Sequence, residues 1–226
     1  MQTKEYQGKA LRYLVIEPDD YQVGRAYPIV VLLHGYGSHM GDLANLCPTI
    51  DRSGYLYVCP NAPLAMDLGF RSVGYAWINP PDWGDIISYQ SVGDLINMTI
   101  EEVMGNYDVL EGGVALGGFS QGGIVTLMMG LSNPDSFRGL VALSASVIDQ
   151  DGLRSLLPGD RSQAIFISHG TTDTVIPVSE GRTARQFLVA EGYLPDYHEY
   201  SMAHEITDHV VSDLTLWLHK VLPPLA

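Results

Sequence analysis

The stretch VALGGFSQGG, residues 114–123, places Ser120 among four glycines directly after an apolar run. Within it, Gly118 to Gly122 match the pattern G-x-S-x-G, in which a serine occupies a strained turn between a strand and a helix. The pattern alone is weak evidence in a chain that contains 24 glycines. Its context is stronger, because GGVALG before the serine is typical of a strand and GIVTLMMGL after it is typical of a helix. The stretch therefore predicts a strand, a tight turn that carries Ser120, and a helix.

The rest of the chain repeats this alternation of apolar, β-branched runs with segments of helical spacing. Such alternation predicts an α/β protein with a mostly parallel central sheet flanked by helices on both faces. We expect the segment 10–17 to be an edge strand, because its apolar and polar residues alternate, and 28–35 to be central. The predicted strands are 10–17, 28–35, 55–60, 112–119, 139–146, 164–170 and 196–201, and the predicted helices are 90–107, 121–133, 178–192 and 205–222.

The length of the chain suits one α/β domain, and no linker or internal repeat divides residues 1–226. The segment 61–85 departs from the regular alternation, since it is rich in proline, glycine and aromatic residues and holds two of the three tryptophans. Long loops inside compact domains usually serve function. We expect 61–85 to form a loop or partial lid near the active site; a loop packed by its own aromatic side chains is the alternative.

The chain carries a formal net charge of -14, from 26 acidic residues against 12 lysines and arginines. This charge argues against partners such as nucleic acid or an anionic membrane and favours a neutral or cationic substrate. No stretch is long and apolar enough to span a bilayer, and the first ten residues lack the apolar core of a secretory signal. Cys47 and Cys59 have neither the number of a disulfide framework nor the spacing of a metal site. We expect two buried free thiols in a cytoplasmic protein.

A serine on such a turn needs a base, and the base needs a carboxylate that orients it. In this architecture the three residues follow in the order Ser, Asp or Glu, His, each on a loop at the carboxyl end of a strand. Asp173 follows the predicted strand 164–170, and His204 follows the predicted strand 196–201. We expect both at the sheet edge that carries Ser120. The alternative acids Asp149 and Asp151 follow the preceding strand, a position that some hydrolases use.

The oxyanion of an acyl-transfer intermediate needs donors held in place, usually two backbone N–H groups. Gln121 follows the predicted nucleophile at a helix N-terminus, so its amide is one candidate. The second is the amide of Tyr36, in the glycine-flanked turn HGYGS that follows the first central strand; an ordinary tight turn is the alternative.

With these residues in place, the sequence resembles the α/β-hydrolase superfamily, and within it the carboxylesterase/phospholipase group that includes acyl-protein thioesterases. The segments that carry the resemblance are LLHGYGS at 32–38, GFSQGG at 118–123, HGTTDTVIP at 169–177 and MAHEI at 202–206. It implies an α/β-hydrolase fold, a catalytic triad of Ser120, Asp173 and His204, and an oxyanion hole from the amides of Tyr36 and Gln121.

Two positions depart from the family pattern: Ser38 stands where aspartate is frequent, and Ala203 where glycine is frequent. Neither change removes a catalytic atom, but both lie near the site. The related dienelactone hydrolases use a cysteine nucleophile, so Ser120 argues against their activity.

The predicted function is that of a serine carboxylesterase that hydrolyses small carboxylic esters through an acyl-enzyme, with no metal and no cofactor. The alternatives are an acyl thioesterase or a lysophospholipase, then a non-catalytic binding protein with the same fold, and last a peptidase. Apolar residues near the entrance suit a homodimer as well as a substrate. Four aromatic residues of segment 61–85 are candidates for binding the substrate: Phe70, Tyr75, Trp77 and Trp83.

Overall fold

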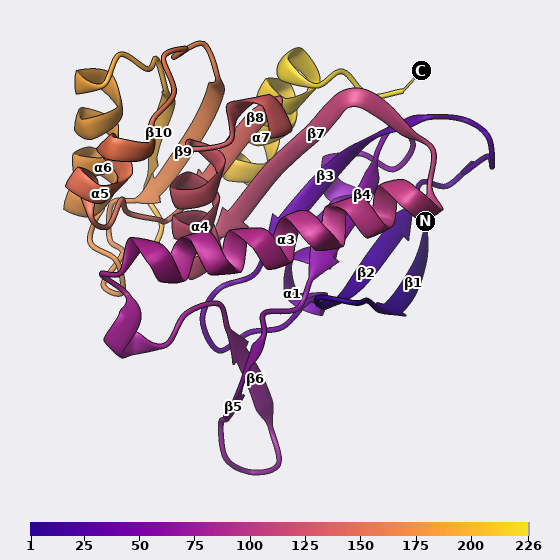
Figure 1. Cartoon of the computed structure of the whole chain (residues 1–226), viewed down its shortest axis with the longest axis horizontal. Coiled ribbons are helices and arrows are strands. Elements are labelled where there is room, and N and C mark those ends of the chain that lie inside the picture. The colour runs from indigo at the N-terminus through magenta and orange to yellow at the C-terminus, as the bar shows by residue number, and fades with distance from the viewer. Residues whose placement is uncertain (226) are drawn as a thin grey trace.

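The computed structural model describes residues 1–225 of the chain and has the mostly parallel sheet flanked by helices that the sequence predicts (Figure 1). The strands are β1 (Gln2–Gln7), β2 (Arg12–Glu17), β3 (Tyr27–Leu33), β4 (Leu56–Pro60), β5 (Leu64–Asp67), β6 (Val73–Ala76), β7 (Val109–Phe119), β8 (Gly139–Leu143), β9 (Ala164–Gly170) and β10 (Asp196–Tyr200). The α-helices are α1 (Gly41–Ala44), α2 (Cys47–Ile50), α3 (Ile86–Asn106), α4 (Gln121–Gly130), α5 (Gln150–Leu156), α6 (Val178–Ala190) and α7 (Asp208–Val221), and short 3-10 helices span Pro80–Asp82 and Pro134–Ser136.

Eight strands form the central sheet in the order β1-β2-β4-β3-β7-β8-β9-β10. The six strands from β4 to β10 in this order run parallel, while β1 and β2 pair antiparallel at one end. Parallel strands end at the same edge of a sheet, so the loops that follow β3, β7, β9 and β10 meet there. These are the loops that carry the predicted site residues.

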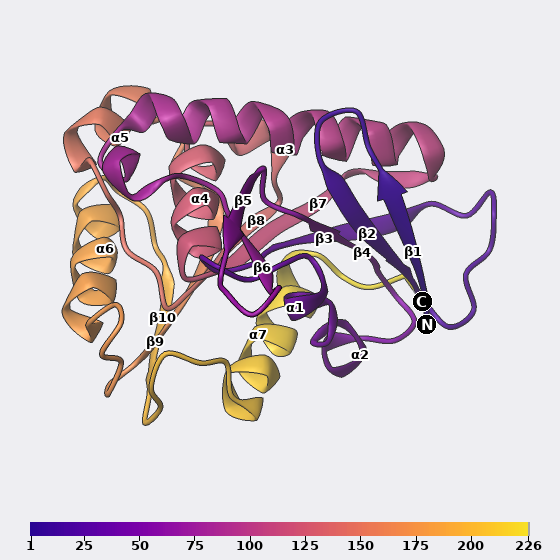
Figure 2. The ribbon, with the colours of Figure 1, turned by 90° about the horizontal axis from the view of Figure 1, so that it is seen from below.

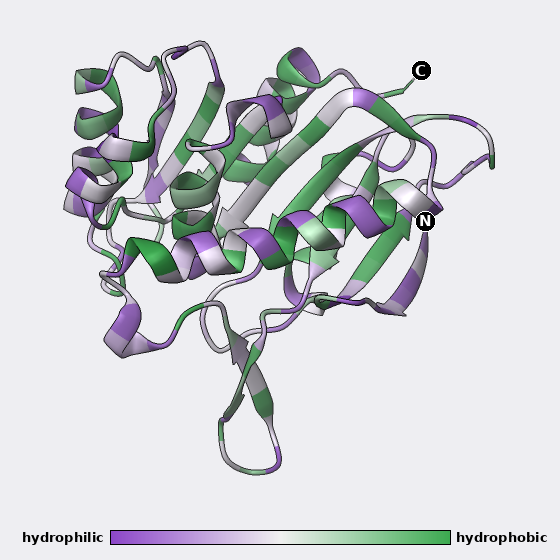
Figure 3. Ribbon diagram, in the orientation of Figure 1, coloured by the Kyte–Doolittle hydropathy of each residue, from purple (hydrophilic) through white to green (hydrophobic). Residues whose placement is uncertain are grey.

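Helices cover both faces of the sheet (Figure 2). The alternation of side chains along β3 explains this arrangement, since Ile29 and Val31 belong to the core on the face that α3, α4 and α6 cover, whereas Val30 and Leu32 belong to the core on the face that α1, α2 and α7 cover. All seven residues of β3 are buried. Figure 3 shows the same pattern, with hydrophobic residues concentrated along the central strands. No helix of the described chain combines the length and apolarity that a membrane span requires.

The structure differs from the sequence-based expectation at one end of the sheet. The segment 10–17, expected as an edge strand, corresponds to β2, which lies one position inside because β1 pairs along its outer side. β1 has the sequence QTKEYQ and no buried residue, so it lacks the apolar pattern that identifies a strand. Exposed charged side chains of this kind are common on edge strands.

The segment 61–85 is more regular than its composition suggests. It contains a hairpin of β5 and β6, which projects from the body of the molecule (Figure 1), followed by the short helix Pro80–Asp82. Tyr75 of β6 fastens the hairpin to the turn after β3, because its amide donates to the Ser38 carbonyl and its carbonyl accepts from the Gly37 amide, both at 2.8 Å. The hairpin is therefore held at the edge where the candidate site lies.

Candidate active site

Ser120 occupies the turn between β7 and α4 in a strained backbone conformation. Its φ of 54° and ψ of -120° lie in a region that a non-glycine residue rarely adopts. Glycines make the turn possible, because a Cβ atom on Gly122 would lie 2.1 Å from the Leu33 carbonyl oxygen and one on Gly118 would lie 2.3 Å from the Gly122 carbonyl carbon. The close packing holds Ser120 in this strained conformation at the carboxyl end of the central strand β7.

Asp173 and His204, the predicted acid and base, are in direct contact. His204 Nδ1 lies 2.6 Å from Asp173 Oδ2, the distance of a charge-assisted hydrogen bond. The other carboxylate oxygen, Oδ1, accepts from the amides of Val175 at 2.8 Å and Ile176 at 2.9 Å. The Asp173 side chain is fully buried, whereas that of His204 is 16% exposed. The imidazole is thus oriented from a buried carboxylate while its Nε2 edge stays free for a reacting group.

The ring of His204 also packs on Phe119, the residue before Ser120, with 4.7 Å between the ring centroids. The loops after β7, β9 and β10, which carry the three predicted residues, therefore lie side by side. The alternative acids lie elsewhere: Asp149 accepts from the Gly152 amide and caps α5, and Asp151 pairs with Arg154.

The two predicted oxyanion donors belong to turns that touch each other. A Cβ atom on Gly35 would lie 3.4 Å from the Ser120 Cβ, so the turn after β3 lies against the serine. Within that turn the Gly37 and Ser38 amides donate to protein carbonyls, but no hydrogen bond of the described residues uses the Tyr36 amide. The Gln121 amide is at the first position of α4, where the helix offers it no acceptor. Both amides are available to a ligand beside Ser120.

The side chain of Gln121 has a contact that the sequence did not predict. Its amide oxygen accepts from the Trp77 backbone N–H and its amide nitrogen donates to the Ile78 carbonyl, both at 2.8 Å. Trp77 in turn donates its indole N–H to the His34 carbonyl at 2.8 Å. These bonds fasten the segment 61–85 to the serine turn and to the end of β3. They join residues more than forty positions apart in sequence, so no local pattern reveals them.

His34 is a buried histidine of this network and binds the start of the same segment. Its Nε2 accepts from the Ala62 amide at 3.1 Å and its Nδ1 lies 2.8 Å from the Gly35 carbonyl. Burial lowers the pKa of His34 to about 4. The ring is therefore neutral near pH 7 and serves as a structural acceptor.

A mainly apolar cavity of about 310 Å³ opens beside Ser120. Tyr36 and Trp83 form one side of it, with their rings packed edge to face at 5.7 Å. The Trp83 indole donates to the Ile78 carbonyl at 3.1 Å, which fixes the ring. The remaining lining residues are Tyr89, Gln121, Ile124, Ser146, Ile148, Val175, Ile176, Pro177 and Glu180.

Of the four aromatic residues predicted to bind the substrate, only Trp83 lines this cavity. Phe70 is fully exposed near the tip of the hairpin, and Tyr75 is half-buried and packs against the main core. Trp77 is buried beneath the site, where its indole N–H has the His34 carbonyl as acceptor. The four rings are close in sequence but lie in different parts of the segment: Phe70 in the hairpin turn, Tyr75 in β6, and Trp77 and Trp83 after it. The sequence analysis did not predict that Val175, Ile176 and Pro177 line the cavity. Their position shortly after Asp173, on the same loop, could have indicated it.

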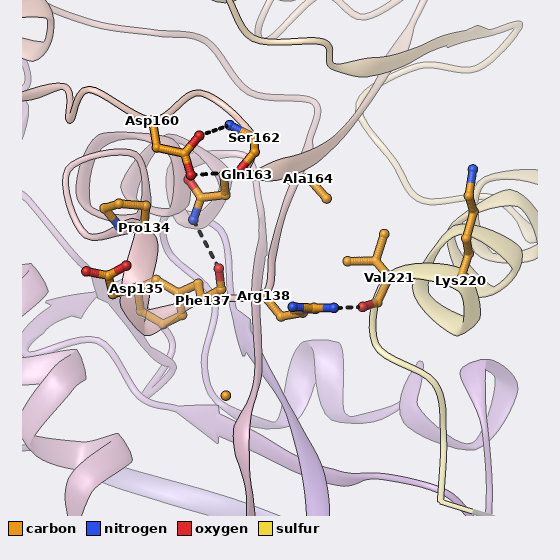
Figure 4. Close-up of a pocket in the computed structure, with 11 residues that line it drawn as sticks. Pro134, Asp135, Phe137, Arg138, Asp160, Ser162, Gln163, Ala164, Lys220 and Val221 are labelled. Carbon is orange, nitrogen blue, oxygen red and sulfur yellow. Dashed lines mark hydrogen bonds between the residues drawn. The ribbon is translucent and has the colours of Figure 1, made fainter.

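A larger cavity of about 520 Å³ lies at the opposite edge of the sheet, near the start of β8 and β9 (Figure 4). Some of its polar groups bind one another, since Arg138 donates to the Val221 carbonyl and Gln163 to the Phe137 carbonyl (Figure 4). Ser120 is not among its lining residues, whereas Ser120 lines the smaller cavity. We therefore assign the candidate active site to the smaller cavity.

Comparison with known proteins identifies the family. The family model described as phospholipase/carboxylesterase matches residues 15–222. The chain belongs to the phospholipase/carboxylesterase family. It is 29% identical over 210 residues to an acyl-protein thioesterase 1 from Kluyveromyces lactis, with 86% of this chain and 92% of that protein covered. Among solved structures, the esterase PE8 has a TM-score of 0.79 at 22% identity, with 98% of this chain and all of that chain covered. A carboxylesterase from Mesorhizobium loti also has a TM-score of 0.79, at 17% identity over 96% of this chain and 99% of that one.

Membership in this family makes the protein a serine hydrolase of the carboxylic ester hydrolase class. It favours an enzyme over the alternative of a non-catalytic binding protein.

Proposed function

We propose that the protein hydrolyses small carboxylic esters through an acyl-enzyme on Ser120. The observation that carries this proposal is a serine in a strained turn whose neighbour Phe119 packs on a histidine that is bound at 2.6 Å to a buried carboxylate. In this assignment His204 is the general base, Asp173 orients it, and the amides of Tyr36 and Gln121 form the oxyanion hole.

The reaction follows from these positions. His204 takes the hydroxyl proton as Ser120 Oγ attacks the ester carbonyl, and the carbonyl oxygen becomes an oxyanion between the two amides. The bond to the leaving group then breaks, and His204 returns the proton to the departing oxygen. Water, deprotonated by His204, attacks the acyl-enzyme, and the acid is released as Ser120 recovers its proton.

The cavity beside Ser120 supports a small, uncharged acyl group. Its volume of about 310 Å³ is at the lower end of the range for small-molecule sites, and aromatic and aliphatic side chains form most of its wall. A short or medium acyl chain would bury its apolar surface against Trp83, Ile124 and Ile176.

A second candidate is the hydrolysis of acyl thioesters, and the acyl-protein thioesterase 1 relatives favour it. The same acyl-enzyme chemistry serves an ester and a thioester, because the oxyanion and the base act identically on both. The two candidates differ in the leaving group alone, so the catalytic residues do not separate them.

A panel of matched substrates tests both candidates. Esters and thioesters with acyl chains from two to sixteen carbons, together with a lysophospholipid, are compared by kcat/KM. The proposal expects a maximum at short to medium chains on the oxygen ester. A maximum on long-chain thioesters would overturn the small-ester assignment in favour of the thioesterase, and a maximum on the lysophospholipid would overturn both.

A further inference from the structure

His169 is a fully buried histidine that the mechanism above does not use. It lies near the end of β9, four residues before Asp173, and its side chain has no exposed surface. Its Nε2 is 2.8 Å from the Ile176 carbonyl oxygen. A carbonyl can only accept, so Nε2 carries a proton and donates it to Ile176.

The other ring nitrogen of His169 has no partner among the described residues. It faces α6, where a Cβ atom on Gly181 would lie only 2.4 Å from Nδ1. A proton on Nδ1 would be buried without an acceptor, which costs free energy. These contacts favour the tautomer with its proton on Nε2.

The protonated edge of His169 also faces the candidate catalytic acid. His169 Nε2 lies 3.7 Å from Asp173 Oδ2, the oxygen that accepts from His204. Ile176, whose carbonyl His169 holds, donates its own amide to Asp173 Oδ1 at 2.9 Å. His169 therefore touches the acid on one side and fixes one of its donors on the other.

We propose that His169 is a positioning residue for the Asp173–His204 pair. Its Nε2–H holds the loop 173–176 in the conformation that presents two amides to Asp173 Oδ1, and it places a partial positive charge beside Oδ2. Both effects keep the carboxylate aimed at His204 Nδ1. The inference rests on the proposed roles of Ser120, Asp173 and His204.

Three variants separate this positioning role from a purely structural role, in which the His169 side chain would only fill volume in the core. His169→Gln keeps an N–H that reaches the Ile176 carbonyl. His169→Asn places its amide one bond short of that position, and His169→Met fills the volume without a donor. Wild type and variants are compared by steady-state kinetics on a short ester, by thermal unfolding, and by the proton NMR resonance of the His204 Nδ1–H.

For folded His169→Met we expect kcat to fall about 10- to 100-fold, because a misaligned base is costly in rate. KM should rise by a smaller factor than kcat falls, because Val175 and Ile176 of the same loop line the cavity. The short His204–Asp173 bond predicts a strongly downfield Nδ1–H resonance, which should move upfield in His169→Met and His169→Asn. His169→Gln should retain most of the kcat and the downfield resonance.

Equal kcat and an unmoved resonance in His169→Met would overturn the inference. If His169→Met does not fold, the comparison of His169→Gln with His169→Asn decides, and equal kcat in these two would overturn it. Ser120→Ala separates this outcome from failure of the proposed function. Wild-type turnover in Ser120→Ala would refute the function itself, whereas an inactive Ser120→Ala with a fully active His169→Met would refute the role of His169 alone.

Discussion

At the scale of single residues, the site depends on Asp173, which is buried and surrounded by donors. Two backbone amides bind one of its oxygens and His204 binds the other. A carboxylate accepts from all three, but an amide side chain would offer His204 a donor or a weaker acceptor. The tautomer and the orientation of the base thus follow from this one side chain.

Replacing this carboxylate tests its role. Asp173→Asn should lower kcat by about four orders of magnitude, because the imidazole would adopt the wrong tautomer. The measurement is steady-state hydrolysis of a short ester, with Asp149→Asn as the control that should keep wild-type kcat. A fully active Asp173→Asn would show that another acid orients the base.

His34 gives a prediction on stability at the same scale. Its folded-state pKa of about 4 lies below the unfolded value near 6.5, so between these values the unfolded chain binds a proton that the folded chain does not. The free energy of unfolding should therefore fall as the pH drops through this window, by about 2 kcal/mol between pH 7 and pH 4.5. Urea unfolding at pH 7 and pH 4.5 measures the change.

The variant His34→Gln retains an acceptor for the Ala62 amide but does not titrate, so it is the control. Its free energy of unfolding should change less between pH 7 and pH 4.5. An identical pH dependence in wild type and His34→Gln would mean that other groups cause the loss.

At the scale of elements, long-range hydrogen bonds fix the position of the segment 61–85 against the rest of the fold. Gln121 at the start of α4 binds the backbone that follows β6, and Trp77 binds the end of β3. Both side chains are buried, so each broken bond leaves an unsatisfied polar group. The position of Trp83 in the cavity wall follows from this attachment.

Gln121→Ala should therefore lower the free energy of unfolding by about 2–4 kcal/mol and raise KM, because Trp83 loses its support. Chemical denaturation and ester kinetics measure the two effects. Gln163→Ala is a matched control at the opposite edge, where Gln163 also donates to backbone carbonyls, and it should destabilise without changing KM. An unchanged KM in Gln121→Ala would separate the segment from substrate binding.

The residue order along the chain was sufficient to predict much of this fold and site. All seven predicted strands and all four predicted helices have counterparts in the structure, because each carries an apolar period or a continuous apolar run over several residues. Ser120, Asp173 and His204 could be selected because parallel strands end at one edge. The contacts of Gln121, Trp77 and His169 could not, since they depend on which distant backbone groups meet after folding. β1 escaped prediction because none of its residues is buried.

At the scale of the whole molecule, the chain has a net charge of -14, although the cavity beside Ser120 is mostly apolar. A negative surface raises the local concentration of cationic substrates, and salt screens this effect. The cytoplasmic location and the homodimer stay predictions.

The charge predicts a salt effect that depends on the substrate. For an ester with a trimethylammonium group, kcat/KM should fall about threefold or more between low salt and 0.5 M salt, whereas the neutral tert-butyl analogue should hardly change. Initial rates at low substrate concentration measure both. An equal response of the two esters would exclude electrostatic steering.

The central claim is that Ser120 is the nucleophile, and covalent labelling tests it most directly. A fluorophosphonate reacts with a serine only when a base and an oxyanion site activate it. We expect one equivalent of label on the wild-type protein, located at Ser120 by peptide mass spectrometry, with Ser120→Ala unlabelled and inactive toward esters. Label at another residue, or a folded Ser120→Ala that hydrolyses esters at the wild-type rate, would contradict the account.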